Sequence, residues 1–234
     1  MKTVWIFLIL VTAAASQQFS SSSWNVKDSE VTFVVGAPRP APIVTASPYS
    51  ADEVQEYRSP DGTSGSRSNV IGHFARDAEG RSRMERAYKP APIWLTEIFD
   101  PVAGVAYLLD DQKKVAHRMP LPPAAATAAS PANPRATIEK LDSQTIEGVL
   151  VEGKRTVFGS PAGSGRPNLT VESWESPELK LTLLTKSSNG YTTRLTNLSR
   201  IQPDSALFRP PSDYTVVDEG ASFPMALQFS DRVR

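Results

Sequence analysis

The sequence contains no cysteine and only two histidines among its 234 residues. Without thiols the chain cannot form a disulfide, a thiolate metal site, a cysteine nucleophile or a lipid-modified cysteine. A secreted domain without disulfides must be stabilised by its core, and roughly 200 mature residues are enough to bury a substantial one. This combination favours a bacterial periplasm or exterior over an animal extracellular fluid.

An excess of charge of either sign is also missing. Basic and acidic residues number 25 each, so the field of the whole chain attracts neither nucleic acid nor an anionic membrane surface. Two triplets match the glycosylation sequon, at Asn168 and Asn197. Such triplets arise often by chance, and we assign them no role.

Long hydrophobic runs are absent except at the N-terminus, where residues 1–16 have the organisation of a signal peptide. Lys2 supplies a positive charge, residues 4–11 an apolar core, and residues 13–16 a small-residue cleavage site. The apolar run has about eight residues, whereas a bilayer crossing needs about 20. We therefore expect a cleaved signal, a periplasmic or secreted location, and no integral membrane segment after cleavage.

Residues 17–62 are rich in serine, proline and alanine. The prolines at positions 38, 40, 42 and 48 deny the backbone regular ladder hydrogen bonds. Within this stretch, residues 31–35 have a strand-like pattern, and residues 51–57 fit either a helix or a strand. The composition predicts a flexible leader.

Residues 63–218 carry strand-like runs separated by turn residues, which predicts a single antiparallel β domain. A proline- and alanine-rich insert over 119–135 divides it, and residues 219–234 are expected to form a C-terminal tail. Turn signals include Gly80, the Pro101 to Gly104 turn and the Asn189-Gly190 pair. The predicted strands are 70–76, 81–88, 93–99, 105–109, 113–118, 144–158 with bulges or bends at Gly148 and Gly153, 169–174, 179–186 and 191–200.

The predicted fold class is mainly β, a curved antiparallel sheet or partial barrel with few short helices. In the run 179–186 the side chains of Leu179, Leu181 and Leu183 share one face, so one face is buried and the other is wet. Each half of the domain has an apolar face and too few residues to cover it. We therefore expect one continuous sheet, with Phe208, Tyr214 and Val216 packing back onto it.

Several segments resemble a known group of proteins: Asp-Pro-Val-Ala-Gly-Val-Ala-Tyr-Leu-Leu-Asp at 100–110, Thr-Ile-Glu-Gly at 145–148, Glu-Ser-Trp-Glu-Ser-Pro-Glu-Leu-Lys at 172–180, and the ending at 203–216. They resemble exported bacterial proteins of unknown function, common in acidobacteria-like genomes. The sheets of those proteins look similar to the periplasmic lipoprotein-carrier fold of outer-membrane lipoprotein sorting. The resemblance covers roughly residues 65–218. It implies a curved sheet around an apolar cavity that holds acyl chains, although the helices that close the carrier cavity have no counterpart here.

Catalytic chemistry finds little support in the sequence. His73 and His117 lie in no metal-binding spacing and beside no glycine-framed serine. We interpret His117 as a surface or edge residue and His73 as a partly buried structural imidazole. The loop over 159–165 lacks the lysine and helix of a phosphate-binding loop. We therefore expect no catalytic residue, no metal ligand and no cofactor.

Charged side chains gather at turns and around one predicted hairpin. Two acidic pairs beside turns are interpreted as caps of backbone amides: Asp110 with Asp111, and Glu172 with Glu175. Arg76, Arg81, Arg83 and Arg86 alternate with acidic residues. That pattern is typical of a salt-bridged, solvated ribbon rather than a basic patch.

A concave sheet without a covering helix leaves apolar surface that a ligand or a partner protein can cover. This is the basis of the functional hypothesis. We expect a non-enzymatic exported protein that binds an apolar or amphipathic ligand, a lipid or acyl chain, in the concavity. The alternative is a structural module whose sheet docks another protein of the cell envelope, and an enzyme ranks third. The candidate ligand-binding residues are Trp94, Phe99, Tyr107, Trp174, Leu181 and Leu183.

Overall fold

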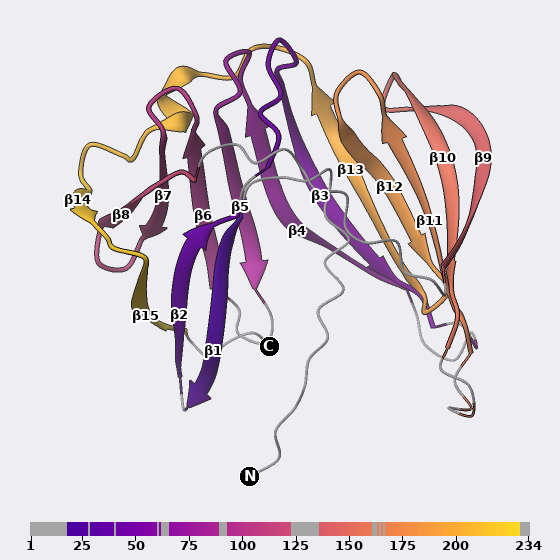
Figure 1. The fold of residues 1–234 in the computed structure, drawn as a ribbon, viewed down its shortest axis with the longest axis horizontal. Helices are drawn as coiled ribbons and strands as arrows, with labels where there is room; N and C mark the ends of the chain where they lie inside the picture. The colour runs from indigo at the N-terminus through magenta and orange to yellow at the C-terminus, as the bar shows by residue number, and fades with distance from the viewer. Residues whose placement is uncertain are drawn as a thin grey trace.

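A computed structural model describes residues 18–27, 29–39, 41–59, 61, 66–88, 93–122, 136–160, 163, 165 and 167–229. In these ranges the chain is built of β-strands with one short 3-10 helix, η1 (Ser205–Phe208). The fold is mainly β, as predicted, and its larger sheet is curved and does not close into a barrel (Figure 1). The expected signal peptide lies outside the described residues.

The larger sheet has twelve strands in the order β14-β8-β7-β6-β5-β4-β3-β13-β12-β11-β10-β9. Its first meander contains β3 (Tyr49–Tyr57), β4 (Arg67–Arg76), β5 (Ser82–Tyr88), β6 (Ile93–Asp100), β7 (Val105–Asp110) and β8 (Val115–Pro120). The second contains β9 (Ala136–Ile146), β10 (Val149–Phe158), β11 (Leu169–Ser176), β12 (Leu181–Ser187) and β13 (Tyr191–Ser199). The twelfth strand, β14 (Thr215–Asp218), is parallel to β8.

The two meanders join where β3 pairs antiparallel with β13. This seam makes one continuous sheet, which confirms the sequence-based expectation. The chain passes from β8 to β9 through the proline-rich insert, and these strands lie near opposite ends of the sheet (Figure 1). Residues 123–135 of the insert lie outside the described residues.

Aspartate side chains shape the turns between neighbouring strands. Asp110 Oδ1 accepts hydrogen bonds from the backbone N–H groups of Gln112, at 3.1 Å, and Lys113, at 3.0 Å. Asp77 Oδ1 does the same for Glu79, at 3.0 Å, and Arg81, at 2.9 Å. Such Asx turns satisfy amides that the ladder leaves unpaired, which confirms the interpretation of Asp110 as a cap.

A second, three-stranded sheet packs on the first, and it corrects two predictions. Its order is β1-β2-β15, with β1 (Phe19–Lys27), β2 (Glu30–Pro38) and β15 (Ser222–Gln228). The expected flexible leader over 17–62 and the expected tail over 219–234 therefore contain strands, and β3 lies near the centre of the larger sheet. The prolines were misleading because Pro38 ends β2, Pro42 and Pro48 lie in the connection to β3, and Pro224 sits in an edge strand.

The predicted long strand over 144–158 is instead part of a hairpin. β9 and β10 are joined by Glu147 and Gly148, which both have positive φ angles, of 49° and 75°. That pair of conformations is the one that a two-residue hairpin turn needs, so Gly148 is a turn residue rather than a bulge. Gly153 does lie at a register shift in the β9–β10 ladder, as expected.

The larger sheet has two distinct faces. We call the inner face the one that carries Phe74, Met84 and Phe99, and the outer face the one that carries His73, Arg83 and Ile98. The three-stranded sheet packs on the inner face over β6, β7 and β8, through an intersheet cluster of Val31, Phe33, Val35, Ile93, Leu95, Leu108, Met119, Phe223, Met225 and Leu227. On the outer face, Phe208 of η1 packs on Ala75, Ile98, Leu109 and Ala116, with Tyr214 beside them.

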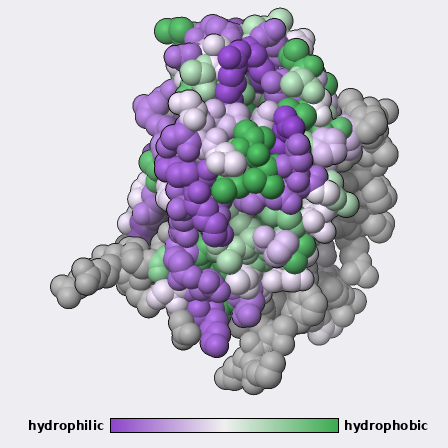
Figure 2. All heavy atoms as spheres, turned by 90° about the vertical axis from the view of Figure 1, so that its left-hand side faces the viewer, coloured by the Kyte–Doolittle hydropathy of each residue, from purple (hydrophilic) through white to green (hydrophobic). Residues whose placement is uncertain are grey.

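The free end of the sheet at β14 presents a mostly polar surface with a small apolar patch (Figure 2). β14 itself exposes Val216 and Val217, at 45% and 39%. The strand is only four residues long, and a short edge offers little backbone for another chain to pair with.

Candidate functional site

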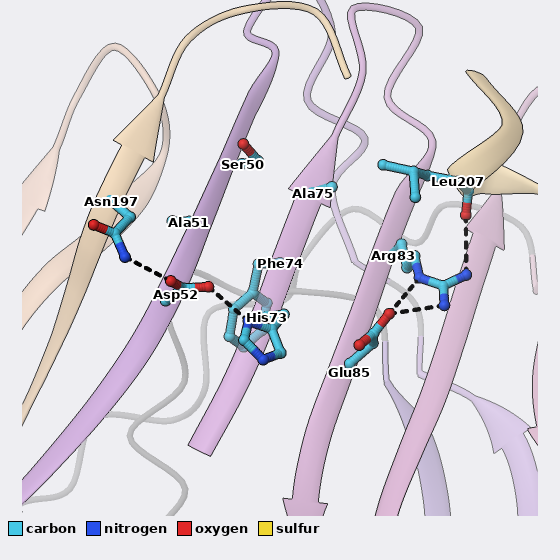
Figure 3. A pocket seen from close by; sticks show the side chains of 10 residues that line it. All are labelled: Ser50, Ala51, Asp52, His73, Phe74, Ala75, Arg83, Glu85, Asn197 and Leu207. Atoms are coloured by element: carbon cyan, nitrogen blue, oxygen red, sulfur yellow. Dashed lines mark hydrogen bonds and ion pairs between the residues drawn. The ribbon is translucent and has the colours of Figure 1, made fainter. Parts of the chain in front are cut away.

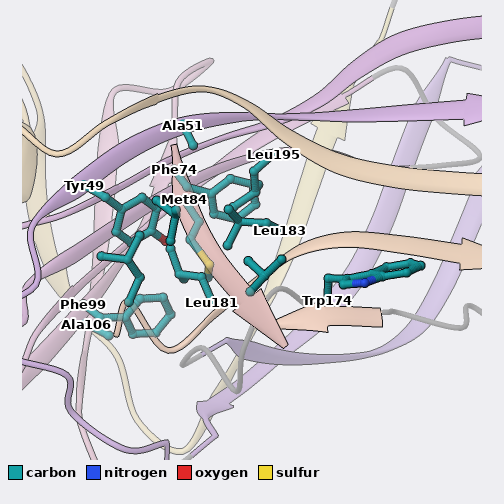
Figure 4. Close-up of a cluster of buried hydrophobic side chains, with 13 residues drawn as sticks. Tyr49, Ala51, Phe74, Met84, Phe99, Ala106, Trp174, Leu181, Leu183 and Leu195 are labelled. Carbon is teal, nitrogen blue, oxygen red and sulfur yellow. The ribbon is translucent and has the colours of Figure 1, made fainter. Parts of the chain in front are cut away.

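The inner face carries a continuous apolar cluster that extends over β3 to β7 and β10 to β13. We call it the inner cluster; it comprises Tyr49, Ala51, Phe74, Met84, Phe99, Ala106, Val149, Val151, Trp174, Leu179, Leu181, Leu183 and Leu195 (Figure 4). These side chains are between 0% and 8% exposed. Alternation along each strand places them on one side, because successive side chains of a strand point to opposite faces.

The inner cluster differs from the intersheet cluster in what packs on it. Among the described residues, only Phe19 and Leu121 reach it from outside the larger sheet. The three-stranded sheet lies beside it, over β6 to β8. The two sheets share no strand pairing, so side-chain contacts hold them together along this boundary.

Four of the six predicted ligand-binding residues lie together in the inner cluster: Phe99, Trp174, Leu181 and Leu183. Trp94 and Tyr107 instead lie on the outer face, where Trp94 is 44% exposed and Tyr107 packs beside Phe208. Trp94 and Phe99 are five positions apart on one strand, so their side chains must point to opposite faces. The alternation of side chains along a strand is a signal in the sequence that separates the four inner-face residues from Trp94 and Tyr107.

Two opposite charges interrupt the inner face, and sequence reasoning did not single out either as a site residue. In one row across the sheet, Glu53 of β3 faces Gly72 of β4, which faces Arg86 of β5. Glu53 is 6% exposed, and burial raises the pKa of its carboxyl although the charge of Arg86 opposes the shift. Their position follows from parity with Ala51 and Met84, which are inner-face residues.

The Arg86 guanidinium lies over the ring of Phe74, with 4.9 Å between its carbon and the ring centroid. Its Nε atom is buried and has no hydrogen-bond acceptor among the described residues. No ion pair joins Arg86 to Glu53, both of which the structure describes. A buried donor without an acceptor is unusual in a folded protein, because leaving it unsatisfied costs roughly 1–3 kcal/mol.

Arg76, in contrast to the half-buried Arg86, is buried on this side of the molecule, and its side chain has hydrogen-bond acceptors. Its side chain donates to Ser47 O, at 3.0 and 2.9 Å, and to Leu179 O, at 2.7 Å. It also lies over the ring of Tyr49, whose pKa burial raises to about 12. Arg76 thus ties the chain before β3 to the turn before β12 and acts as a structural anchor.

The expected salt-bridged ribbon describes only part of the arginine cluster. Arg81 pairs with Asp77, at 2.5 Å, and also with Glu79, while Arg83 pairs with Glu85 at 2.7 Å. Arg76 and Arg86 instead lie on the inner face, where Arg76 is buried and Arg86 is half-buried. The prediction relied on the alternation of charge signs along the sequence and did not consider that neighbouring arginines point to different faces of the sheet.

A hollow of about 240 Å³ lies on the outer face, opposite the inner cluster (Figure 3). The bottom of the hollow is formed by residues that include the small Ser50 and Ala75, and Asn197 and Leu207 lie on opposite sides of it. Asp52 accepts a hydrogen bond from Asn197 Nδ2, at 2.7 Å, and lies 2.6 Å from His73 Nδ1. The bond from Asn197, followed by that from His73, holds the pKa of the Asp52 carboxyl below its ordinary value.

Both histidines occupy places other than those expected. The His73 side chain is 48% exposed and stacks on Trp94, with ring centroids 5.5 Å apart, so it is a surface group. The His117 side chain is 16% exposed; it bonds Glu219 Oε1 at 2.7 Å and stacks on Phe223 of the three-stranded sheet at 4.5 Å. β8 is covered at its edge by β14, which is why His117 is not an edge residue.

The space between the two sheets is small. A gap of about 10 Å³ lies among residues that include Phe19, Trp24, Phe33, Leu95 and Leu108. That volume is about the smallest that holds one water molecule, roughly 10–15 Å³. An acyl chain therefore requires the layers to move apart, or a place on the inner cluster beside them.

Comparisons with known proteins give weak likenesses. No protein-family model and no curated protein matches the chain. Among solved structures, PNGF-II is similar with a TM-score of 0.33 and 12% identity over 75% of this chain, which spans 31% of the PNGF-II chain. A DUF1329 family protein from Desulfovibrio piger is similar with a TM-score of 0.20 and 9% identity, covering 71% of this chain and 91% of that one.

A putative outer membrane lipoprotein-sorting protein domain from Vibrio parahaemolyticus is also similar. Its TM-score is 0.19 at 10% identity, and the match covers 69% of this chain and 89% of that domain. TM-scores of this size carry no argument about what this chain binds. In the described part of the chain, no helix has the length and apolarity to cross a membrane.

Proposed function

We propose that this protein is a non-enzymatic, exported β-sheet protein that binds an amphipathic ligand with an acyl chain on the inner face of its larger sheet. The observation that carries the proposal is the inner cluster. It is a continuous apolar face to which, from the described residues outside the sheet, only Phe19 and Leu121 contribute. The side chains of this cluster are 0–8% exposed, so a ligand has to enter among them, and each Å² of its apolar area that they then bury is worth about 25 cal/mol.

The ligand is amphipathic rather than purely apolar because charges lie within the same face. Glu53 is buried and Arg86 is half-buried beside Phe74 and Met84, and the buried Nε–H group of Arg86 lacks an acceptor among the described residues. Buried charges are costly unless they are paired or hydrogen-bonded. A ligand with one polar end and one apolar end satisfies both parts of this surface.

A binding role is also favoured over a hydrolytic one by the surroundings of the histidines. A serine hydrolase needs a histidine in hydrogen-bond reach of both a carboxylate and a serine. His73 bonds Asp52 and His117 bonds Glu219, and among the described residues neither has a hydrogen bond to a serine. The periplasmic or secreted location rests on the signal-like residues 1–16.

The proposal is tested with the neutral fluorescent probe N-phenyl-1-naphthylamine, whose emission rises in apolar surroundings. We expect saturable binding to the full chain and displacement by glycerol monolaurate. Leu181→Ala should weaken binding of the probe several-fold, whereas Ile201→Ala, at a side chain that is 79% exposed, should leave it unchanged. Circular dichroism of each variant checks that the sheet is intact.

Absence of saturable probe binding would contradict the proposal. Equal weakening by Leu181→Ala and Ile201→Ala would contradict the inner face as its location. In either case the alternative of a protein-docking module of the cell envelope becomes the better account. Cross-linking in the envelope would then be the way to find the docked protein.

A further inference from the structure

The row formed by Glu53, Gly72 and Arg86 has the features of a head-group site on the inner face. Glu53 and Arg86 are each one strand away from Gly72, so their backbones are separated by about 10 Å. Gly72 has no side chain, and the Phe74 ring and Glu53 Oε2 lie 2.6 and 3.3 Å from where its Cβ would be. The missing Cβ is what allows the ring and the carboxylate to fold over β4.

The two charged groups leave complementary hydrogen-bonding capacity. Arg86 Nε–H is a buried donor without an acceptor among the described residues, and Glu53 offers carboxylate oxygens as acceptors. The guanidinium lies over the face of Phe74, which favours its charge but accepts no conventional hydrogen bond. A group that both accepts and donates hydrogen bonds would satisfy both residues at once.

A free carboxylate is a poor match for this row. It would accept from Arg86 but offer nothing to Glu53, and the two like charges would repel each other in a buried setting. Glu97 lies on the same face on the adjacent strand, is 3% exposed, and accepts a hydrogen bond from the backbone N–H of Phe19 at 3.2 Å.

We propose that Glu53 and Arg86 select a neutral head group with both donor and acceptor capacity, such as the hydroxyls of a monoacylglycerol, over the carboxylate of a fatty acid. The inference rests on the proposed function, because it names the polar end of the ligand that the inner cluster holds. Arg86 Nε–H donates to a hydroxyl oxygen, and that hydroxyl, or its neighbour, donates to Glu53.

The test compares three ligands with the same twelve-carbon chain: glycerol monolaurate, laurate and dodecane. Each displaces N-phenyl-1-naphthylamine from the full chain at pH 7.5, below its aggregation concentration. We expect glycerol monolaurate to bind about tenfold more tightly than laurate, the difference that one or two hydrogen bonds to charged groups produce. Dodecane reports the apolar contribution alone.

Variants assign the preference to the row. Arg86→Met should weaken glycerol monolaurate about tenfold and leave dodecane unchanged, and Glu53→Gln should strengthen laurate about tenfold by removing the repulsion. Arg83→Met is the matched control, since Arg83 is on the same strand but on the outer face, paired with Glu85. Should Arg86→Met fail to fold by circular dichroism, Arg86→Lys and the gain in Glu53→Gln still test the site.

The outcomes separate this inference from the proposed function. Equal affinity for laurate and glycerol monolaurate, or an Arg86→Met loss no larger than that of Arg83→Met, would overturn the head-group site while leaving an apolar binding face. If neither the probe nor dodecane binds, the proposed function fails, and the head-group site fails with it.

Discussion

The two halves of the inner face are built in different ways. Over β6 to β8, the three-stranded sheet packs on the larger sheet, and the intersheet cluster between them consists of apolar side chains. Over β3 to β5 and β10 to β13, the larger sheet supplies nearly all of the inner cluster itself. Buried charges lie in both halves, Glu97 on β6 in the first and Glu53 and Arg76 in the second. The first half is the core between the two sheets, and the second half is where we propose that a ligand binds.

The largest effect should come from the structural half. Phe33 is 3% exposed and stacks on Trp24 with centroids 4.2 Å apart, so Phe33→Ala should lower the free energy of unfolding by about 3–5 kcal/mol. Chemical denaturation measures the loss. Because the two sheets share no strand pairing, hydrogen exchange should accelerate in β1, β2 and β15 while β10 to β12 stay protected.

The control for this prediction is Val26→Ala on β1, at a side chain that is 43% exposed. It should change stability by less than about 0.5 kcal/mol. Equal acceleration of exchange in both sheets would show that they unfold as one unit, which removes the distinction between the halves.

The next effect concerns the anchor at the boundary of the ligand half. Arg76→Met leaves two carbonyl groups, Ser47 O and Leu179 O, without their donor, and should cost about 3 kcal/mol of stability. Thermal or denaturant unfolding measures it. Arg83→Met removes an ion pair with Glu85 and a 3.3 Å hydrogen bond to Leu207 O from a side chain that is 18% exposed, and should cost about 1 kcal/mol. Similar losses for the two variants would contradict the assignment of Arg76 as an anchor.

The seam between the meanders gives a smaller effect with a matched pair of glycines. A Cβ at Gly190 would lie 2.1 Å from Arg58 O, while a Cβ at Gly148 meets nothing within 4 Å. Both have positive φ, of 94° and 75°. Gly190→Ala should cost about 2–3 kcal/mol and Gly148→Ala about 1 kcal/mol, measured by denaturant unfolding. The reverse order would contradict the packing at the β3–β13 seam.

The smallest effects are opposite pH dependences at two adjacent residues. Asp52 on the outer face has a folded pKa below its ordinary 3.8, so its contribution is present above pH 3.8 and is lost as pH falls through the folded value. Glu53 on the inner face has a folded pKa above its ordinary 4.5, so stability declines as pH rises from 4.5 through the folded value.

Unfolding free energies from pH 2.5 to pH 8 measure both effects against Asp52→Asn and Glu53→Gln. The difference between wild type and Asp52→Asn should shrink at the acid end, and that between wild type and Glu53→Gln should turn against wild type toward neutral pH. Parallel curves for the two variants would contradict the opposite directions of the two pKa shifts.

Much of the fold follows from local sequence patterns. The strands from β4 to β8 and from β11 to β13 lie close to the predicted ranges, because turn residues such as Asp77, Asp110 and Gly190 mark where each strand ends. The continuous sheet also follows, since neither half has enough residues to cover its own apolar face. These signals are local, and local signals can be read from one sequence.

The rest depends on contacts between distant segments. β2 pairs with β15, almost 200 residues further along the chain, and no local sequence pattern predicts this strand pairing. The prolines near the ends of these strands also led the prediction away from assigning strands there. Of the six candidate ligand-binding residues, Phe99, Trp174, Leu181 and Leu183 gather in one cluster, whereas Trp94 and Tyr107 lie on the opposite face because the prediction did not apply strand parity. Glu53 and Arg86 were missed because a charge in a strand is normally a sign of solvent.

The most direct test of the account is native mass spectrometry of the full chain purified from the cells that make it, followed by extraction and identification of whatever co-purifies. The account predicts a one-to-one complex with an acyl-bearing amphiphile whose head group is neutral, or its formation when the bare protein is incubated with glycerol monolaurate. A bare mass that acquires no adduct under those conditions would contradict the claim that the inner face binds a ligand.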